Sequence, residues 1–171
     1  FFMVKVKTWN TPAGDLMKGK KGVVMGIANH SSIAWGIAEA LAKQGAEMAF
    51  TYQNEKLKKR VETLADSIGV NCLIECDVTN SVSVQESFET LKQKFGKIDF
   101  FVHAIAFSDK EELKGRYVDT SRKNFLMSMD ISCYSFVETS KYASSLMTEG
   151  GSILTLTYLG AERVVPSYNV M

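Results

Sequence analysis

Short apolar runs alternate with longer runs of helical period along most of this 171-residue chain, which limits the folds open to it. The strand-like runs cover residues 21–25, 47–51, 70–76, 98–103 and 152–157. The helix-like runs cover residues 33–44, 54–67, 81–95 and 122–147. Helices of this length between strands imply right-handed crossovers. We therefore predict an α/β fold with a doubly wound parallel sheet.

The predicted strand order is 3-2-1-4-5, with strands numbered along the chain, as in Rossmann-like sheets. The switch point then lies between strands 1 and 4, where such sheets bind ligands at their carboxyl edge. The helix ends agree with this assignment. Gly45 suits the C-terminal cap of the first helix, and Asn54 suits the N-terminal cap of the second.

Residues 1–16 do not join the alternation. The run Met17-Lys-Gly-Lys resembles a natural chain start, whereas this chain begins with Phe1. We interpret residues 1–16 as a vector-derived or loosely attached segment, with an extra edge strand over Phe1–Lys7 as the alternative. The sheet domain is predicted to cover residues 17–171.

The charge balance argues against two classes of partner. A net charge of +1, with 23% charged residues, offers no basis for binding nucleic acid or an anionic membrane. No apolar run approaches the ~18 residues that cross a bilayer, and the N-terminal residues lack the ordered regions of a signal peptide. We expect one domain, a cytoplasmic location, and neither a nucleic-acid nor a membrane partner.

The three cysteines are an odd number and indicate a reducing compartment. Cys72 and Cys76 fall in one strand-like run with their side chains on one face, so we expect buried free thiols. His30 and His103 show no spacing that would complete a metal site with them. No metal is expected.

The segment from Gly26 to Gly36 lies between the first strand and the first helix, where α/β sheets bind a pyrophosphate at the helix N-terminus. Gly26 permits a sharp turn off the strand. Ser31 and Ser32 occupy positions that suit a helix N-cap or a phosphate-binding hydroxyl. The segment is not a G-x-G-x-x-G motif, and a plain capped turn is the alternative.

The ends of the later strands carry residues suited to the rest of a dinucleotide. Gln53 stands where such folds contact the adenosine ribose, and it does not repel a 2′-phosphate as a carboxylate would. Asp77, followed by Val78, ends the third strand and can accept a bond from the adenine amino group, or else cap a short turn. The small residues of 103–107 let the backbone approach a flat ring. Together these strand ends predict a dinucleotide cofactor.

Two tyrosines, Tyr158 and Tyr168, follow the last strand-like run. At the carboxyl edge of a parallel sheet, a tyrosine in this position can lie beside a bound cofactor. We therefore take both as candidate catalytic residues.

With these motifs the chain resembles the enoyl-[acyl-carrier-protein] reductases of bacterial fatty-acid synthesis, a branch of the short-chain dehydrogenase/reductase superfamily. The general superfamily carries Ser, then Tyr, then Lys four residues on, whereas this branch carries two tyrosines and a lysine seven residues after the second. Position 155 is Thr, where the general pattern has serine. The resemblance rests on Gly26–Gly36, Ala49–Gln53, Cys76–Val78, Asp130–Phe136, Tyr158–Arg163 and Tyr168–Met171.

The resemblance implies that NADH reduces a trans-2-enoyl thioester on acyl carrier protein, in a cytoplasmic homotetramer that packs through the long fourth helix. Tyr168 would donate a hydrogen bond to the thioester oxygen, and Tyr158 would shape the pocket beside the nicotinamide. Ser108 would contact the substrate. The cofactor-binding residues it implies are Gly26, Ser32, Ile33, Gln53, Asp77, Val78 and Ile105.

Several features depart from the pattern or leave alternatives open. Ala106 stands where many relatives have glycine. The expected lysine, the last strands and the substrate lid would follow Met171, so we expect a polypeptide that ends there to be inactive. The alternatives are a ketone- or alcohol-handling dehydrogenase of the same superfamily, which would carry a lysine four residues after Tyr168, and a non-catalytic dinucleotide-binding protein.

Overall fold

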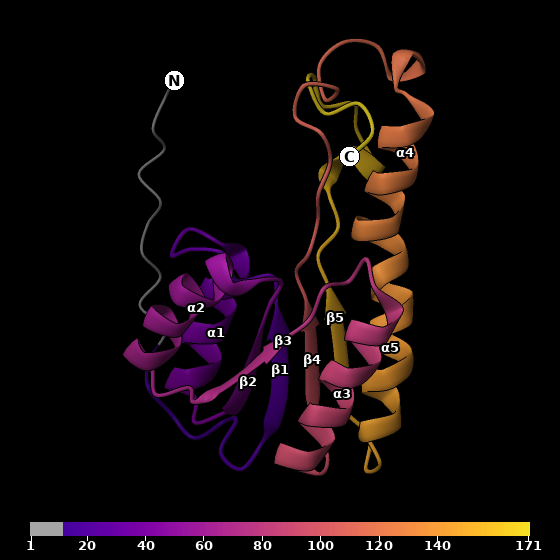
Figure 1. Cartoon of the computed structure of the whole chain (residues 1–171). Coiled ribbons are helices and arrows are strands. Elements are labelled where there is room, and N and C mark those ends of the chain that lie inside the picture. The colour runs from indigo at the N-terminus through magenta and orange to yellow at the C-terminus, as the bar shows by residue number, and fades with distance from the viewer. Residues whose placement is uncertain (1–11) are drawn as a thin grey trace.

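A computed structural model describes residues 12–171 and contains a five-stranded parallel sheet (Figure 1). The strands are β1 (Lys21–Met25), β2 (Glu47–Tyr52), β3 (Cys72–Glu75), β4 (Phe100–His103) and β5 (Ser152–Thr155). Their order in the sheet is β3-β2-β1-β4-β5, and all four pairings are parallel. The predicted doubly wound fold and its strand order are confirmed.

Helices cover both faces of the sheet, as buried parallel strands require (Figure 1). They are α1 (Ile33–Lys43), α2 (Glu55–Ser67), α3 (Ser81–Phe95), α4 (Arg122–Met129) and α5 (Ser135–Leu146), with short 3-10 turns η1 (Tyr117–Asp119) and η3 (Leu159–Ala161). The face that carries Val24 and Phe50 packs against α1 and α2. The opposite face, with Val23 and Phe101, packs against α3 and α5. Adjacent residues of one strand thus serve two separate cores.

The helix caps follow the predicted residues. The Asn54 side chain accepts a hydrogen bond from the Leu57 N–H at 3.1 Å and so caps α2. Gly45, just after α1, has a φ of +86°, a conformation that glycine adopts without steric cost. Both predicted caps are confirmed.

The long fourth helix contains a wider turn that the sequence pattern did not reveal. Between α4 and α5 the backbone forms a π-helical turn, η2 (Asp130–Tyr134). Two hydroxyl groups donate hydrogen bonds to backbone carbonyl groups of this region. Ser135 Oγ donates to Ile131 O at 2.7 Å, and Thr139 Oγ1 donates to Ser135 O at 2.6 Å. The predicted helix over 122–147 is therefore present but not uniformly α-helical.

Three strands are shorter than predicted. The Ile98 N–H bonds to Leu146 O at the end of α5, at 3.1 Å, so β4 begins only at Phe100. The predicted strands over 70–76 and 152–157 likewise shorten to Cys72–Glu75 and Ser152–Thr155. The apolar runs in the sequence continue past the residues that pair in the sheet. Hydropathy does not distinguish paired strand residues from the residues that flank them.

Strand β5 forms one edge of the sheet. Its apolar side chains Ile153 and Leu154 are 36% and 43% exposed. An apolar edge strand with free backbone groups is a surface prone to further strand pairing.

The described part of the N-terminal segment is tied to the end of α1. Gly14 N–H donates to Lys43 O and Met17 N–H to Gln44 O, both at 2.9 Å, and Gln44 Nε2 donates to Pro12 O at 2.7 Å. Residues 12–16 are therefore anchored to the domain rather than loose. The alternative edge strand over Phe1–Lys7 lies outside the described residues.

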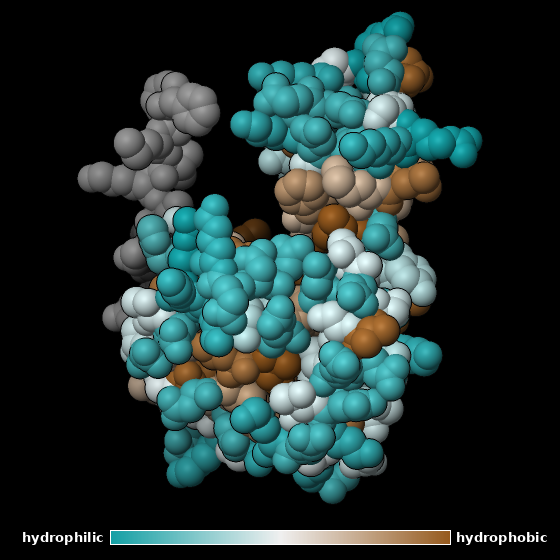
Figure 2. Space-filling model, viewed as in Figure 1, coloured by the Kyte–Doolittle hydropathy of each residue, from teal (hydrophilic) through white to brown (hydrophobic). Residues whose placement is uncertain are grey.

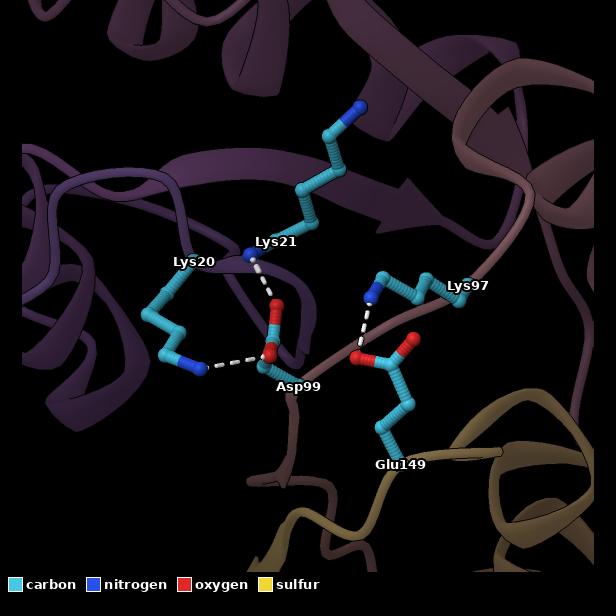
Figure 3. Close-up of polar contacts among 5 residues, drawn as sticks. All are labelled: Lys20, Lys21, Lys97, Asp99 and Glu149. Atoms are coloured by element: carbon cyan, nitrogen blue, oxygen red, sulfur yellow. Dashed lines mark hydrogen bonds and ion pairs between the residues drawn. The ribbon is translucent and has the colours of Figure 1, made fainter.

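Charged residues join the amino ends of neighbouring strands, at the edge opposite the carboxyl ends of the sheet (Figure 3). The Asp99 carboxylate accepts hydrogen bonds from the Lys21 N–H and from Lys20 Nζ, both at 2.9 Å. Nearby, Lys97 forms an ion pair with Glu149. These contacts connect the starts of β1, β4 and β5.

Cys72 and Cys76 are buried free thiols, as predicted, and Cys133 is free and exposed. Burial raises the pKa of the Cys76 thiol to about 11, so this side chain remains protonated. Within residues 12–171, no helix has the length and apolar character needed to span a bilayer.

Candidate functional site

A cleft of about 400 Å³ opens where the carboxyl ends of β1 to β4 meet, at the switch point of the sheet. In Figure 2 a hollow with apolar side chains along it separates the body of the molecule from the projecting lobe above. Four of the predicted cofactor residues, Gly26, Gln53, Val78 and Ile105, line the cleft. Its other lining residues are Ile27, Ala28, Thr51, Tyr52, Leu57, Cys76, Thr79, Ala104, Ala106, Phe107 and Ile131.

Gly26 is required where β1 leaves the sheet. Its φ is +99°, and a Cβ atom at this position would lie 2.0 Å from Ala104 O, a backbone atom. The Ala104 N–H in turn donates to Met25 O at 3.2 Å. Glycine thus permits the segments that follow β1 and β4 to run side by side at the base of the cleft.

The segment after Gly26 brings Ser32 to the start of α1, but its hydroxyl does not cap the helix. Ser32 Oγ accepts hydrogen bonds from the N–H groups of Ala28 and Asn29, both at 3.1 Å. No acceptor within residues 12–171 engages the N–H groups of Ile33 and Ala34. Ser32 and Ile33 are not among the residues that line the cleft. They lie at the start of α1, where the free N–H groups suit an anion.

Asp77 caps a turn, which is the alternative interpretation of this residue. Its Oδ1 accepts bonds from Thr79 N at 3.0 Å and Thr79 Oγ1 at 2.8 Å. Partial burial opposes ionisation, but these bonds and one from Gln53 hold the pKa of Asp77 below its ordinary value. Asp77 is thus a carboxylate hydrogen-bonded within its own turn, while its contact with an adenine remains a prediction.

Ser108 lies in a second hollow of about 550 Å³, beside the first. Phe107 lines both, so the segment that follows β4 forms the wall between them. The second hollow is lined by Phe107, Ser108, Asp109, Lys110, Glu112, Lys123, Asn124 and Met127. Its position next to the dinucleotide cleft suits the predicted substrate contact of Ser108, which remains a prediction.

Tyr158 and Tyr168 stack on each other, with 4.8 Å between ring centroids and 24° between ring planes. Both side chains are exposed, and neither belongs to the lining of the cleft or of the second hollow. The chain after them returns to the segment that follows β4, because Asn169 N–H donates to Leu113 O at 3.3 Å. The structure thus brings the two tyrosines together, outside the predicted pocket.

His103, at the end of β4, is buried and neutral. Burial lowers its pKa to about 4. Its Nε2 lies 2.8 Å from Ser135 Oγ, which donates to Ile131 O and must therefore accept from the imidazole. Nδ1 then accepts from Thr155 Oγ1 at 3.4 Å. The Thr155 hydroxyl is thus directed to a buried histidine.

Four cleft residues were not predicted from the sequence: Tyr52, Leu57, Thr79 and Ile131. Thr79 carried a usable signal, because a threonine two residues after a strand-ending aspartate is positioned to bond to it. Ile131 fell inside a motif used only for the resemblance, and its place in the cleft depends on how the fourth helix packs.

Within the described part of the chain, no group of three or more His, Cys, Asp or Glu side chains could hold a metal ion. The cleft and the start of α1 suit a dinucleotide in three ways. The N–H groups at the start of α1 are free to bind phosphate, the Gln53 amide can bond to a ribose hydroxyl, and the remaining lining is largely apolar. The stacked tyrosines add two phenol groups able to donate hydrogen bonds.

Comparison with known proteins agrees with this geometry. Residues 26–171 match the family model described as enoyl-(acyl carrier protein) reductase. The chain is 60% identical, over 93% of its length, to enoyl-[acyl-carrier-protein] reductase [NADH] 1 of Rhizobium meliloti (strain 1021).

Two solved structures are similar to it. The Anaplasma phagocytophilum enoyl-(acyl-carrier-protein) reductase, in complex with NAD, superposes on 94% of this chain with a TM-score of 0.91 and 59% identity. The Bacillus cereus enoyl-acyl carrier protein reductase, with NADP+ and indole naphthyridinone, superposes on 92% with a TM-score of 0.90 and 50% identity. The chain spans 58% of the length of the Rhizobium protein, 61% of the Anaplasma chain and 62% of the Bacillus chain.

Proposed function

Because this chain belongs to the enoyl-(acyl carrier protein) reductase family, we propose that its protein reduces trans-2-enoyl groups carried on acyl carrier protein, using NADH, in bacterial fatty-acid elongation. The similar Rhizobium meliloti protein is named as an NADH enzyme, and the similar Anaplasma structure contains NAD. The cleft at the switch point supports the same cofactor.

The residues of the cleft suit NADH in three places. The free N–H groups at the start of α1 would bind the pyrophosphate, with Gly26 keeping the backbone clear beside them. Gln53 would contact the ribose, and Val78 and Asp77 would border the adenine. Ile105 would line the nicotinamide side of the cleft. When bound, NADH supplies the hydride.

The chain's own contribution to the reaction is a donor for developing charge. As hydride reaches the β-carbon of the enoyl thioester, negative charge builds on the thioester oxygen. The Tyr168 hydroxyl would donate a hydrogen bond to that oxygen, an effect worth about 3 kcal/mol for one well-placed donor. Tyr158, stacked on it, would hold the Tyr168 ring and border the acyl group. Ser108 would contact the substrate from the second hollow.

The observation that carries this proposal is the cleft at the switch point of the sheet, which is lined by Gly26, Gln53 and Ile105. The stacked tyrosine pair supports it from a chain segment that is hydrogen-bonded to the one following β4. Thr155, where the general superfamily has serine, directs its hydroxyl to the buried His103, which argues against the serine-dependent chemistry of the ketone-handling branch. The decisive assay follows NADH absorbance with a crotonyl thioester and, separately, with a panel of ketones. We expect oxidation of NADH only with the enoyl substrate. Turnover of ketones alone would contradict the proposal, and NADH binding without turnover of either substrate would favour a non-catalytic dinucleotide-binding protein.

We also propose a homotetramer in the cytoplasm, assembled through the α4–α5 region. Leu126, Tyr134 and Val137 are each more than half exposed on this region, which leaves apolar surface for a second subunit. Light scattering coupled to size exclusion tests the assembly. A monomer at micromolar concentration would contradict it.

A further inference from the structure

Three polar side chains at four-residue spacing form a row along the fourth helix: Asn124, Ser128 and Ser132. Residues four apart share one face of a helix. This polar row faces the segment that follows β4, and its members contact three consecutive residues of that segment, Phe107, Ser108 and Asp109, in reverse order.

The first two contacts involve buried side chains of the helix. Asn124 Oδ1 accepts a hydrogen bond from the Asp109 N–H at 3.0 Å, and Ser128 Oγ donates to Ser108 Oγ at 2.9 Å. Asn124 and Ser128 are 2% and 0% exposed. Buried polar groups are costly unless paired, so these contacts strongly favour one position of the segment.

The third contact is a double one. Ser132 Oγ accepts from the Phe107 N–H at 3.0 Å and donates to Phe107 O at 3.1 Å. One hydroxyl therefore satisfies both backbone polar groups of the residue that borders both hollows. Ser132 belongs to the π turn η2, and the preceding residue, Ile131, lines the cleft itself. Turns of this kind occur frequently at functional sites.

The segment has little else to hold its backbone. After the Ala104 N–H bonds to Met25 O, the backbone donors of 105–109 that find an acceptor within residues 12–171 are those of Phe107 and Asp109, and both acceptors are side chains of the polar row. The path of this segment, and so the wall between the hollows, depends on the helix.

We propose that Ser132 is a positioning residue: its hydroxyl, presented by the π turn, fixes the backbone at Phe107 and so sets the width of the cleft on the side that receives the nicotinamide. This inference rests on the proposed function, because it assumes that the cleft takes NADH. Ser132 itself does not line the cleft and acts through Phe107.

The test compares Ser132→Ala with Ser132→Thr, which restores a hydroxyl, and with Ser140→Ala as a matched control. Ser140 lies on α5, and its hydroxyl has no hydrogen-bond partner in the region that the structure covers. We expect Ser132→Ala to raise the Kd for NADH about five-fold, the order expected for loss of a single hydrogen bond. Ser132→Thr and Ser140→Ala should bind NADH as the unaltered protein does.

A second measurement does not depend on the cofactor. In cofactor-free protein, amide hydrogen exchange at Phe107 should be faster in Ser132→Ala than in the unaltered protein, and unchanged in Ser140→Ala. Unaltered exchange at Phe107, or an unaltered Kd in Ser132→Ala, would overturn the inference. Failure of the unaltered protein to bind NADH would instead overturn the proposed function, while the exchange result would still report on the hydroxyl contact.

Discussion

The rings of Tyr158 and Tyr168 lie face to face, 4.8 Å apart between centroids, although neither ring borders the dinucleotide cleft. Stacking of aromatic rings stabilises the pair beyond simple burial. Ser167, just before Tyr168, has a φ of +64°, a left-handed conformation that is unfavourable for a residue other than glycine. The arrangement of the pair is therefore held against a local backbone cost.

Replacing Tyr168 with Phe removes the hydroxyl and keeps the ring. We expect kcat/KM for an enoyl thioester to fall about 100-fold, as for loss of one donor to a developing oxyanion. The Kd for NADH should not change, because the ring stack is retained. Steady-state kinetics and a cofactor titration check both parts, and a fully active Tyr168→Phe variant would contradict the assigned role.

Replacing Gly26 with Ala places a methyl group on the backbone of the neighbouring segment. The clash with Ala104 O and the positive φ cannot both be relieved locally, so we expect a loss of stability of at least ~1–3 kcal/mol and loss of NADH binding. Gly36→Ala is the matched control, because Gly36 lies inside α1 with open space around its Cα. There alanine should stabilise the helix by up to about 1 kcal/mol. Equal melting temperatures for the two variants would be inconsistent with this account.

The cofactor preference should follow from Gln53. Because position 53 carries a neutral glutamine, no carboxylate at this position repels the 2′-phosphate of NADPH. We therefore expect NADH to bind more tightly than NADPH by only a moderate factor. Gln53→Glu should increase the rejection of NADPH by like-charge repulsion. Titration of both cofactors into both proteins decides the matter, and tighter binding of NADPH to the unaltered protein would contradict the prediction.

Asp99 should contribute stability that depends on pH. The Lys21 backbone N–H and the Lys20 side chain lower the pKa of its carboxyl group in the folded protein (Figure 3). A lowered folded-state pKa means that the contribution is present above the unfolded pKa of about 3.9 and is lost as pH falls through the folded value. We expect Asp99→Asn to reduce the free energy of unfolding by about 1 kcal/mol at neutral pH.

That difference should shrink in acid, which denaturant titrations at several pH values can measure. Glu149→Gln serves as the control, because the Lys97–Glu149 pair is largely exposed and such pairs contribute little. A pH-independent effect of Asp99→Asn would show that the carboxylate charge is not responsible.

Much of the framework could be predicted from the sequence because it depends on local periodicity. The alternation of apolar runs and helical stripes determined the parallel sheet, its strand order and two helix caps at Gly45 and Asn54. The strand-end residues Gly26, Gln53 and Val78 followed from the same logic, because parallel strands place their carboxyl ends at one edge, and the family resemblance added Ile105.

Only the tertiary structure decided which polar groups meet. The tyrosines stack outside the cleft, and the Ser132 hydroxyl reaches Phe107, 25 residues earlier in the chain. Hydropathy records whether a side chain is buried, but not its hydrogen-bond partner or the extra width of a π turn. Those depend on how the long helix and the segment after β4 pack together, and this packing brings together residues that are distant in sequence.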